Sequence, residues 1–177
     1  TTLFRSELGI PLADPDHLTK IDITVDGADE IDPAKYMIKG GGGALLREKL
    51  LALASREMMV IVDETKLVAY LGAHPLPVEI APFIHLSTIH RIQADGYEGK
   101  LRLNKEGKPF VTDNGNYIFD IQYAEPIKDP RVEQQKLKLI SGVLETGLFC
   151  HVAGRVVVGY RDGTVKIHKN LLTFLDP

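Results

Sequence analysis

The chain has 177 residues, of which 44% are hydrophobic and 25% are charged, the usual balance of a globular protein. This length allows one domain, or one domain with a smaller appended lobe. A net charge of -3 argues against a nucleic-acid-binding protein, which needs a basic patch, and no apolar run approaches the length of a membrane span. The single cysteine, Cys150, excludes a disulfide framework and favours a reducing, cytoplasmic compartment.

The first third of the chain has the pattern of an α/β protein. Residues 21–25 alternate apolar and polar side chains, which predicts a strand that stops at the turn Asp26-Gly27. Four glycines then precede a predicted helix over 44–57, and residues 58–62 predict a second strand, apolar on both faces as in a sheet covered on both sides. The apolar stripe of the helix comprises Leu46, Leu50, Leu53 and Ala54, widened by Leu45 and Leu51. This order predicts a Rossmann-like open sheet.

The pattern changes after Pro75-Leu-Pro77. Strands are predicted at 78–80, 100–103, 117–122 and 143–150, and helices at 84–94 and 131–140. This β-α-β-β-α-β order is that of a ferredoxin-like lobe. Residues 155–160 and 164–167 predict a hairpin that returns to the first sheet. The expected fold is therefore α/β, with a Rossmann-like domain made of residues 1–77 and 151–177 and a smaller ferredoxin-like α+β lobe over 78–150.

Charged clusters fall where an open α/β sheet places its ligand, beyond the carboxyl ends of the strands. Asp26-Gly-Ala-Asp29-Glu30 follows the first predicted strand, and Asp63-Glu-Thr-Lys66 follows the second. Lys39 and its glycines lead into the helix that carries Glu48. Glycine backbone near a helix amino end presents N–H groups to anions. One crevice is therefore expected to hold several carboxylates, two lysines and glycine backbone.

Each of these features also has a purely structural interpretation. The acidic residues of 26–32 fit a solvated loop, the glycines fit a flexible loop, and Lys66 fits a surface lysine. Glu48 within Arg47-Glu-Lys49 fits a solvated helix face with local ion pairs. The glycine run does not match the Walker or dinucleotide fingerprints, and the six histidines lack the spacing of a metal site. No catalytic metal and no cofactor are expected.

Taken together, the clusters are more specific than any one of them. Asp26-Gly-Ala-Asp-Glu-Ile-Asp-Pro33, Lys39-Gly-Gly-Gly-Gly-Ala-Leu-Leu-Arg-Glu-Lys49 and Val62-Asp-Glu-Thr-Lys66 resemble, in order and spacing, the signature segments of type A ribose-5-phosphate isomerases. Leu76-Pro-Val-Glu79 and Val111-Thr-Asp-Asn-Gly-Asn116 resemble further segments of that family. The resemblance implies an aldose–ketose isomerase of the non-oxidative pentose phosphate pathway, which interconverts ribose 5-phosphate and ribulose 5-phosphate without a metal.

The resemblance also implies the roles of individual residues. Glu48 would move the proton between C2 and C1, with Asp26 and Lys39 as further catalytic residues. The residues that would contact the substrate are Asp26, Gly27, Ala28, Asp29, Lys39, Gly40, Gly41, Gly42 and Lys66. Lys39 and the glycine N–H groups suit the enediolate oxygen, and an aspartate would assist ring opening or proton exchange between oxygens. The expected partners are a pentose phosphate and further copies of the chain, in a homodimer or homotetramer, with neither nucleic acid nor membrane.

Two features depart from the family pattern. Members carry a Gly-Thr-Gly-Ser-Thr-like phosphate loop near the amino end, whereas this chain begins Thr-Thr-Leu-Phe-Arg without such a loop, an initiator methionine or a signal peptide. We therefore expect the Rossmann-like domain to be incomplete at its amino end. Asp63-Glu-Thr-Lys66 varies from the commoner Asp-x-Ser-Lys, although Asp63 and Lys66 remain.

Two other functions remain open on the sequence alone. One is a sugar-phosphate sensor on a related scaffold, which would need no base at Glu48. The other is a different enzyme of similar architecture, such as a sugar-phosphate deaminase or an acyl-CoA transferase, in which a glutamate would act as nucleophile. The base at Glu48 distinguishes the isomerase from the sensor.

Overall fold

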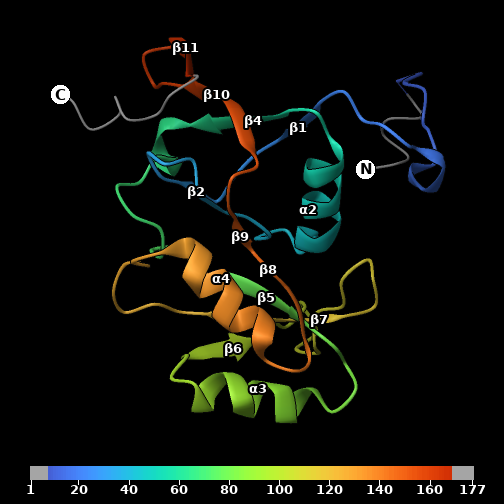
Figure 1. Cartoon of the computed structure of the whole chain (residues 1–177), viewed down its shortest axis with the longest axis vertical. Helices are drawn as coiled ribbons and strands as arrows, with labels where there is room; N and C mark the ends of the chain where they lie inside the picture. The colour runs from blue at the N-terminus through green and yellow to red at the C-terminus, as the bar shows by residue number, and fades with distance from the viewer. Residues whose placement is uncertain (1–7, 169–177) are drawn as a thin grey trace.

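The computed structural model describes residues 8–168. In chain order its elements are the 3-10 helix η1 (Pro15–His17), β1 (Thr24–Asp26), β2 (Glu30–Ile31), β3 (Met37–Ile38), α2 (Leu45–Ala54), β4 (Met58–Asp63), the 3-10 helix η2 (Glu64–Lys66), β5 (Leu76–Ile80), α3 (His85–Ala94), β6 (Gly99–Leu101), β7 (Tyr117–Ile121), α4 (Pro130–Leu139), β8 (Val143–Thr146), β9 (Leu148–Phe149), β10 (Ala153–Gly159) and β11 (Val165–His168). Figure 1 shows β1, β4, β10, β11 and α2 at one end of the long axis, and α3, α4 and β5 to β8 at the other. The ends of the predicted Rossmann-like domain, residues 1–7 and 169–177, lie outside the described residues.

The first sheet has the strand order β1-β4-β10-β11. Strand β4 lies between β1 and β10 and is parallel to both, and β11 pairs with β10 as an antiparallel hairpin. The predicted return of the hairpin to this sheet is confirmed, with Val158 opposite Lys166. Because β1 and β4 are parallel neighbours, the loops that follow Asp26 and Asp63 leave the same edge of the sheet.

Within residues 8–168, other elements cover one face of the first sheet but not the opposite face. Its buried side chains pack with β2, β3, β9 and α2 in one core, which comprises Ile31, Met37, Ala52, Met58, Val60, Val62, Phe149, Val156 and Val158. On β4, Met59 is half-buried and Ile61 is 49% exposed. The predicted cover on both faces is therefore wrong for residues 8–168.

Helix α2 packs through a different face from the predicted one. Its buried residues are Leu45, Lys49 and Ala52, whereas Leu50 and Leu53 of the predicted stripe are 59% and 65% exposed. The periodicity of leucines selected the wrong face because a lysine occupies one of the buried positions. Lys49 can be buried because its long aliphatic stem packs like an apolar side chain while its ammonium group finds partners.

Two element boundaries differ from the predicted ones for one reason. The first strand begins only at Thr24, and the helix ends at Ala54 rather than at residue 57. After the helix the chain becomes extended at Ser55, which forms an isolated bridge with Ile21, and the Arg56 N–H donates to Ile21 O at 2.9 Å. This pairing takes the chain out of the helix and places β4 beside β1.

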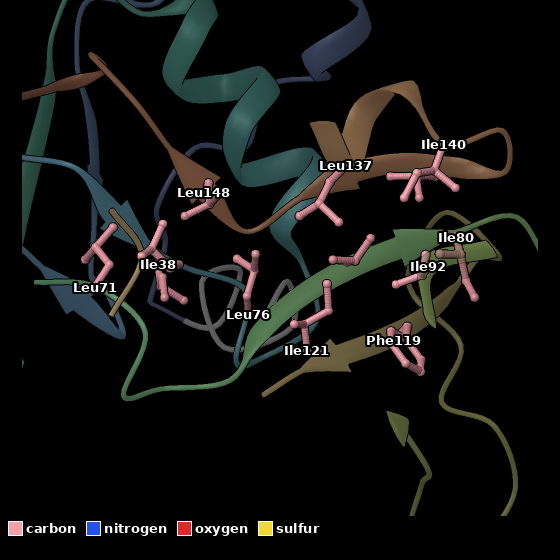
Figure 2. Close-up of a cluster of buried hydrophobic side chains, with 13 residues drawn as sticks. Ile38, Leu71, Leu76, Ile80, Ile92, Phe119, Ile121, Leu137, Ile140 and Leu148 are labelled. Atoms are coloured by element: carbon pink, nitrogen blue, oxygen red, sulfur yellow. The ribbon is translucent and has the colours of Figure 1, made fainter. Parts of the chain in front are cut away.

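The second sheet has the strand order β6-β7-β5-β8, and all neighbouring strands are antiparallel. This is the arrangement of a split β-α-β fold, so the predicted ferredoxin-like lobe is confirmed. Figure 2 shows its core, in which Ile80 and Phe119 of the sheet meet Ile92 of α3 and Leu137 of α4. All four side chains are almost completely buried.

A third, three-stranded sheet, β2-β3-β9, is absent from the sequence prediction. The segment 143–150, predicted as one strand, is instead two strands: β8 pairs with β5 in the lobe, and β9 pairs with β3 in this small sheet. Gly147 lies between them, and its N–H donates to Pro77 O at 2.7 Å while its carbonyl accepts from the Lys39 N–H at 2.9 Å. A side chain at Gly147 would overlap Lys39 O, so a glycine permits the segment to serve both sheets.

We expect Gly147→Ala to destabilise the protein. The added methyl group would overlap Lys39 O and lie 2.9 Å from Pro77 Cδ, so backbone would have to move. Overpacking of this kind costs about 1–3 kcal/mol of unfolding free energy, which urea denaturation measures. Gly159→Ala is the matched control, because a Cβ there meets no atom within 4 Å. Equal unfolding free energies for the two variants would contradict the prediction.

Candidate active site

The predicted site residues meet at the carboxyl end of β1. A pocket of about 210 Å³ is lined by Asp26, Gly27, Ala28, Asp29, Lys39, Gly40, Gly41, Gly42 and Glu48. Lys66, the remaining predicted contact, lies in an adjoining hollow of about 430 Å³ that shares Gly27 and Ala28 with the pocket. Larger hollows lie on the ferredoxin-like lobe, so chemistry and position, rather than size, select this pocket.

Lys39 is buried at the centre of the pocket. It follows β3, and its Nζ donates to Asp26 Oδ2 at 2.8 Å and to Gly27 O at 2.6 Å. The side chain is only 4% exposed, and Nζ lies 5.5 Å from the centroid of the Phe149 ring. A buried ammonium group is costly unless it is paired, so these two acceptors hold the charge in a defined position.

Glu48 faces Lys39 from the first turn of α2. Its Oε2 forms an ion pair with Lys39 Nζ at 3.2 Å. Oε2 itself is buried, although the Glu48 side chain as a whole is 24% exposed. Burial raises the pKa of Glu48 above its ordinary value, the charge of Lys39 opposes this rise, and Asp26 and Asp29 add to it. The interpretation of Glu48 as part of a solvated helix face is therefore wrong.

The glycine run forms a turn held by hydrogen bonds. The Gly41 N–H donates to Asp29 Oδ2 at 2.8 Å, and the Gly43 N–H donates to Gly40 O at 2.9 Å. Gly40 and Gly43 have φ angles of 96° and 90°, in the left-handed region that glycine adopts readily. A Cβ at Gly43 would also lie 2.5 Å from the Phe110 ring. The backbone of this turn therefore requires glycine at two of its four positions.

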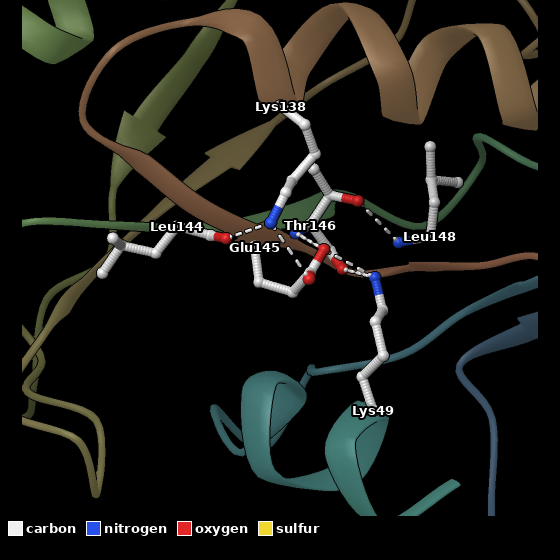
Figure 3. A network of polar contacts seen from close by, with 6 residues as sticks. All are labelled: Lys49, Lys138, Leu144, Glu145, Thr146 and Leu148. Carbon is white, nitrogen blue, oxygen red and sulfur yellow. Dashed lines mark hydrogen bonds and ion pairs between the residues drawn. The ribbon is translucent and has the colours of Figure 1, made fainter. Parts of the chain in front are cut away.

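Lys49 anchors the helix that carries Glu48 (Figure 3). Its Nζ donates to Glu145 Oε1 at 2.8 Å and to Thr146 O at 2.7 Å. Burial lowers the pKa of Lys49, and Glu145 opposes this change. Burial raises the pKa of Glu145, but Lys49, the Thr146 N–H and Lys138 outweigh it, so this pKa lies below its ordinary value. The ion pair fixes the rotation of α2 against β8, which turns the preceding residue, Glu48, towards the pocket.

Two further acidic residues of the segment 26–32 are structural. The carboxylate of Glu30 accepts hydrogen bonds from the Gly72 N–H at 2.7 Å and from the His74 N–H at 2.6 Å. Asp32 Oδ1 accepts from the Tyr36 N–H at 2.9 Å, and burial raises the pKa of Asp32. Both carboxylates are buried outside the pocket, so the interpretation of a solvated loop is wrong for them.

Glu79 holds a loop of the lobe against the helix of the site, a role that the sequence does not reveal. The side chain is completely buried, and its Oε1 accepts from Thr112 Oγ1 at 2.9 Å, Asn116 Nδ2 at 2.8 Å and Asn114 Nδ2 at 3.2 Å. Arg47, which precedes Glu48, donates in turn to Asn114 Oδ1 at 2.9 Å. The sequence does contain one hint of a buried role: Glu79 is the only charged residue in an otherwise apolar strand, and a buried charge must find hydrogen-bond partners.

Arg102 is a second residue that the sequence analysis does not single out. Its Nη1 donates to Gly40 O at 3.1 Å and to Gly41 O at 3.0 Å. Its other guanidinium nitrogens donate to the carboxylate of Asp120, with Nε 2.8 Å from Oδ2 and Nη2 2.5 Å from Oδ1. No local signal marks this residue, because Lys100-Leu-Arg-Leu103 has the alternation of any half-exposed strand.

We expect Asp26→Asn to lower the pKa of Glu48. The substitution removes a negative charge that raises this pKa, and it frees Lys39 to interact more strongly with Glu48, so both effects have the same sign. A carbon-13 NMR titration of the Glu48 carboxyl group measures the change. The midpoint should lie above 4.5 in the parent protein and lower in the variant. Asp95→Asn, on the exposed end of α3, is the control, and an unchanged midpoint in Asp26→Asn would contradict the electrostatic account.

Fold and site together define an α/β protein with a small polar pocket in which a carboxylate, an ammonium group and glycine backbone converge, as in enzymes of acid–base chemistry. Among residues 8–168, no cluster of histidine, cysteine, aspartate or glutamate is placed to hold a metal ion. The same residues include no helix with the length and apolarity to cross a membrane.

Comparison with known proteins gives the family. Residues 1–163 match Ribose 5-phosphate isomerase A (phosphoriboisomerase A). The chain is 55% identical over 160 residues to Ribose-5-phosphate isomerase A of Protochlamydia amoebophila, covering 90% of this chain and 69% of that protein. Over 163 residues it is 45% identical to the protein of the same name from Bacillus mycoides, covering 92% and 73%. The chain belongs to the ribose 5-phosphate isomerase A family, as the resemblance of its segments predicts.

Solved structures agree with this assignment. The structure is similar to the ribose 5-phosphate isomerase from Plasmodium falciparum, with a TM-score of 0.90 and 38% identity over 96% of this chain and 74% of that one. It is also similar to a D-ribose-5-phosphate isomerase solved in complex with phospho-erythronic acid, with a TM-score of 0.88, 38% identity and the same coverage.

Proposed function

We propose that the chain interconverts D-ribose 5-phosphate and D-ribulose 5-phosphate through an enediolate, with Glu48 as the base. The observation that carries this proposal is the position of Glu48, whose buried Oε2 lies 3.2 Å from the ammonium group of Lys39 in the pocket that Asp26 and the glycine backbone also line. A carboxylate whose pKa is raised by burial is suited to take a proton from carbon, and the neighbouring ammonium group can stabilise the charge that forms. Membership of the family supports the same reaction.

The proposed reaction conserves atoms and electrons. In the open-chain aldose, Glu48 takes the proton from C2, and the electron pair of the C–H bond forms a C1–C2 double bond while O1 becomes negative. Lys39 and the Gly42 N–H stabilise this charge. The O2 hydroxyl proton is then transferred to O1 with the help of Asp26 or Asp29, the carbonyl forms at C2, and Glu48 returns its proton to C1.

The shape of the site supports an elongated anionic substrate. Asp26 and Asp29 line the pocket with Glu48 and are suited to accept hydrogen bonds from sugar hydroxyl groups. Lys66 lies in the adjoining hollow and is suited to a charge contact with the phosphate or the terminal hydroxyl. Because the two hollows share Gly27 and Ala28, a sugar phosphate can extend from Glu48 towards Lys66. The related isomerase with bound phospho-erythronic acid supports a phosphorylated sugar-acid shape.

We also propose the assembly and the domain division. The side chains of Phe83 and Leu86 on the lobe are 83% and 70% exposed, which supports self-association into a homodimer or homotetramer. The single thiol supports a cytoplasmic location. The separate strand orders of the two four-stranded sheets support one domain of residues 1–77 and 151–177 and a second of 78–150. Analytical ultracentrifugation tests the assembly, and a monomer at micromolar concentration would contradict it.

Proton exchange in heavy water tests the proposed reaction. NMR follows the C2 proton of ribose 5-phosphate and the appearance of ribulose 5-phosphate as the protein is added. We expect deuterium incorporation together with isomerisation. Binding of the sugar phosphate with neither exchange nor conversion would instead support a sensor. Conversion without any exchange of solvent deuterium, in either direction of the reaction, would argue for transfer without a solvent-accessible base.

A further inference from the structure

The glycine turn of the site is held from outside by a residue of the ferredoxin-like lobe. Arg102 directly follows β6, and its Nη1 lies 3.1 Å from Gly40 O and 3.0 Å from Gly41 O. The rest of the guanidinium group is bound by both carboxylate oxygens of Asp120 on β7. The Arg102 side chain is 16% exposed and that of Asp120 is 24% exposed, so the pair is partly shielded from solvent. A bidentate pair of this kind fixes the direction as well as the position of its donors.

The two carbonyl contacts determine where the neighbouring N–H groups point. In a trans peptide the carbonyl and the N–H of the next residue point in opposite directions, and the described chain has no cis peptide. Gly40 O faces Arg102, and the Gly41 N–H accordingly points away from it and donates to Asp29 Oδ2 at 2.8 Å. By the same geometry, Gly41 O faces Arg102 and the Gly42 N–H points to the opposite side.

The Gly42 N–H differs from its neighbours in having no acceptor. Gly41 and Gly43 donate to Asp29 and to Gly40 O, whereas the Gly42 N–H has no hydrogen-bond partner within residues 8–168. Gly42 lines the same pocket as Lys39 and Glu48. A backbone donor whose direction is fixed in advance, beside the ion pair of the Lys39 ammonium group and the Glu48 carboxylate, has the arrangement of an oxyanion site.

We propose that Arg102, supported by Asp120, is a positioning residue that aims the Gly42 N–H at the enediolate oxygen. The proposal rests on the isomerase function given above. Arg102 does not contact the substrate; it acts by holding two carbonyl groups so that the peptide between Gly41 and Gly42 cannot rotate. Without the guanidinium group, this peptide keeps only the turn's own hydrogen bonds and is flanked by glycines, so it can rotate more easily, because glycine has few conformational restrictions.

The first test compares Arg102→Gln with Arg102→Lys. Removing one oxyanion donor costs about 10²–10³-fold in kcat, so partial loss of its direction should lower kcat about 10–100-fold in Arg102→Gln, with KM changed about threefold or less. Arg102→Lys keeps a charged donor and should recover part of the loss. Arg91→Gln is the control, because Arg91 also donates to a backbone carbonyl of the lobe, Ser141 O at 3.2 Å, but lies away from the pocket. A rise in KM with unchanged kcat would overturn the proposal.

A binding measurement separates positioning from a general effect on the fold. Calorimetry of Arg102→Gln with phospho-erythronic acid, whose carboxylate imitates the charged enediolate, should show about 10-fold or greater weakening. The affinity for ribitol 5-phosphate, which has no charge at C1, should be nearly unchanged. Equal weakening of both ligands would assign Arg102 to the fold rather than to the oxyanion and would overturn the proposal.

Nitrogen-15 NMR of the parent protein gives a test that needs no variant. The amide proton of Gly42 should shift downfield when phospho-erythronic acid binds, more than that of Gly41, which already has an acceptor. An unshifted Gly42 amide in the saturated complex would sink the proposal even if Arg102→Gln failed to fold. A parent protein that fails to isomerise ribose 5-phosphate would instead contradict the underlying function, so the two failures are distinguishable.

Discussion

Glu48→Gln is expected to lower kcat about 10²-fold or more while the fold remains intact, because a positioned general base usually contributes that much. Glutamine has nearly the same shape, and the rotation of α2 is fixed by the neighbouring Lys49–Glu145 pair rather than by Glu48. Steady-state kinetics and the heavy-water exchange of the C2 proton measure the loss. Glu106→Gln, on an exposed turn of the lobe, is the control. A variant with most of its activity would remove Glu48 from the role of base.

The same substitution is expected to leave stability at pH 7 unchanged or higher. The pKa of Glu48 is raised in the folded protein, so the folded state binds this proton more tightly than the unfolded state. Stability therefore falls as the pH rises from the ordinary value of 4.5 through the raised pKa, and the cost persists above it. Glutamine does not ionise and escapes that cost. Urea denaturation at pH 4 and pH 7 checks the sign, and a lower stability of the variant at pH 7 alone would contradict it.

Lys39→Met is expected to produce the other large effect, a fall in kcat of about 10²–10³-fold, because it removes a preorganised charge from the enediolate oxygen. Methionine matches the apolar stem beside Phe149 but cannot pair with Asp26 or Glu48. The variant should also move the acidic limb of kcat/KM to higher pH, because the charge of Lys39 lowers the pKa of Glu48.

The pH profile makes this second prediction specific. Loss of a substrate contact alone would raise KM and leave the acidic limb in place. Lys105→Met, at an exposed position of the lobe, should change neither quantity. If the limb of Lys39→Met moved to lower pH, the ammonium group of Lys39 would not act on Glu48 as its 3.2 Å separation implies.

The sequence predicts where the helices and strands of this fold lie better than it predicts which strands pair with one another. The β-α-β-β-α-β order of the lobe follows from periodicity and turn signals, which are local properties. The division of residues 143–150 between two sheets does not, because it depends on the contacts of Gly147 with Pro77 and Lys39, far away in sequence. The two-residue strands β2 and β3 are too short for periodicity to reveal.

The candidate site can be predicted from its residues taken together, but not from any one of them. Asp26, Glu48 and Lys66 each had an ordinary structural interpretation, and their joint resemblance to one family made the site prediction specific. The structure places Asp26 and Glu48 in one pocket and Lys66 in the adjoining hollow, and it shows that Lys49, part of the solvated helix face in the structural interpretation, is buried. Arg102 could not be predicted, because its contacts with Gly40 and Gly41 cross from one part of the fold to the other.

The junction at Gly147 also bears on how the enzyme admits its substrate. A single residue separates β8 from β9, so no linker there can act as a hinge. Swinging the lobe away from the first sheet would break one of the two backbone hydrogen bonds of Gly147, the Lys49–Glu145 pair and the contacts of Arg102. These contacts oppose a swing of the lobe as a rigid body. The tie between the lobe and the first sheet therefore favours a pocket that is largely formed before the sugar phosphate enters.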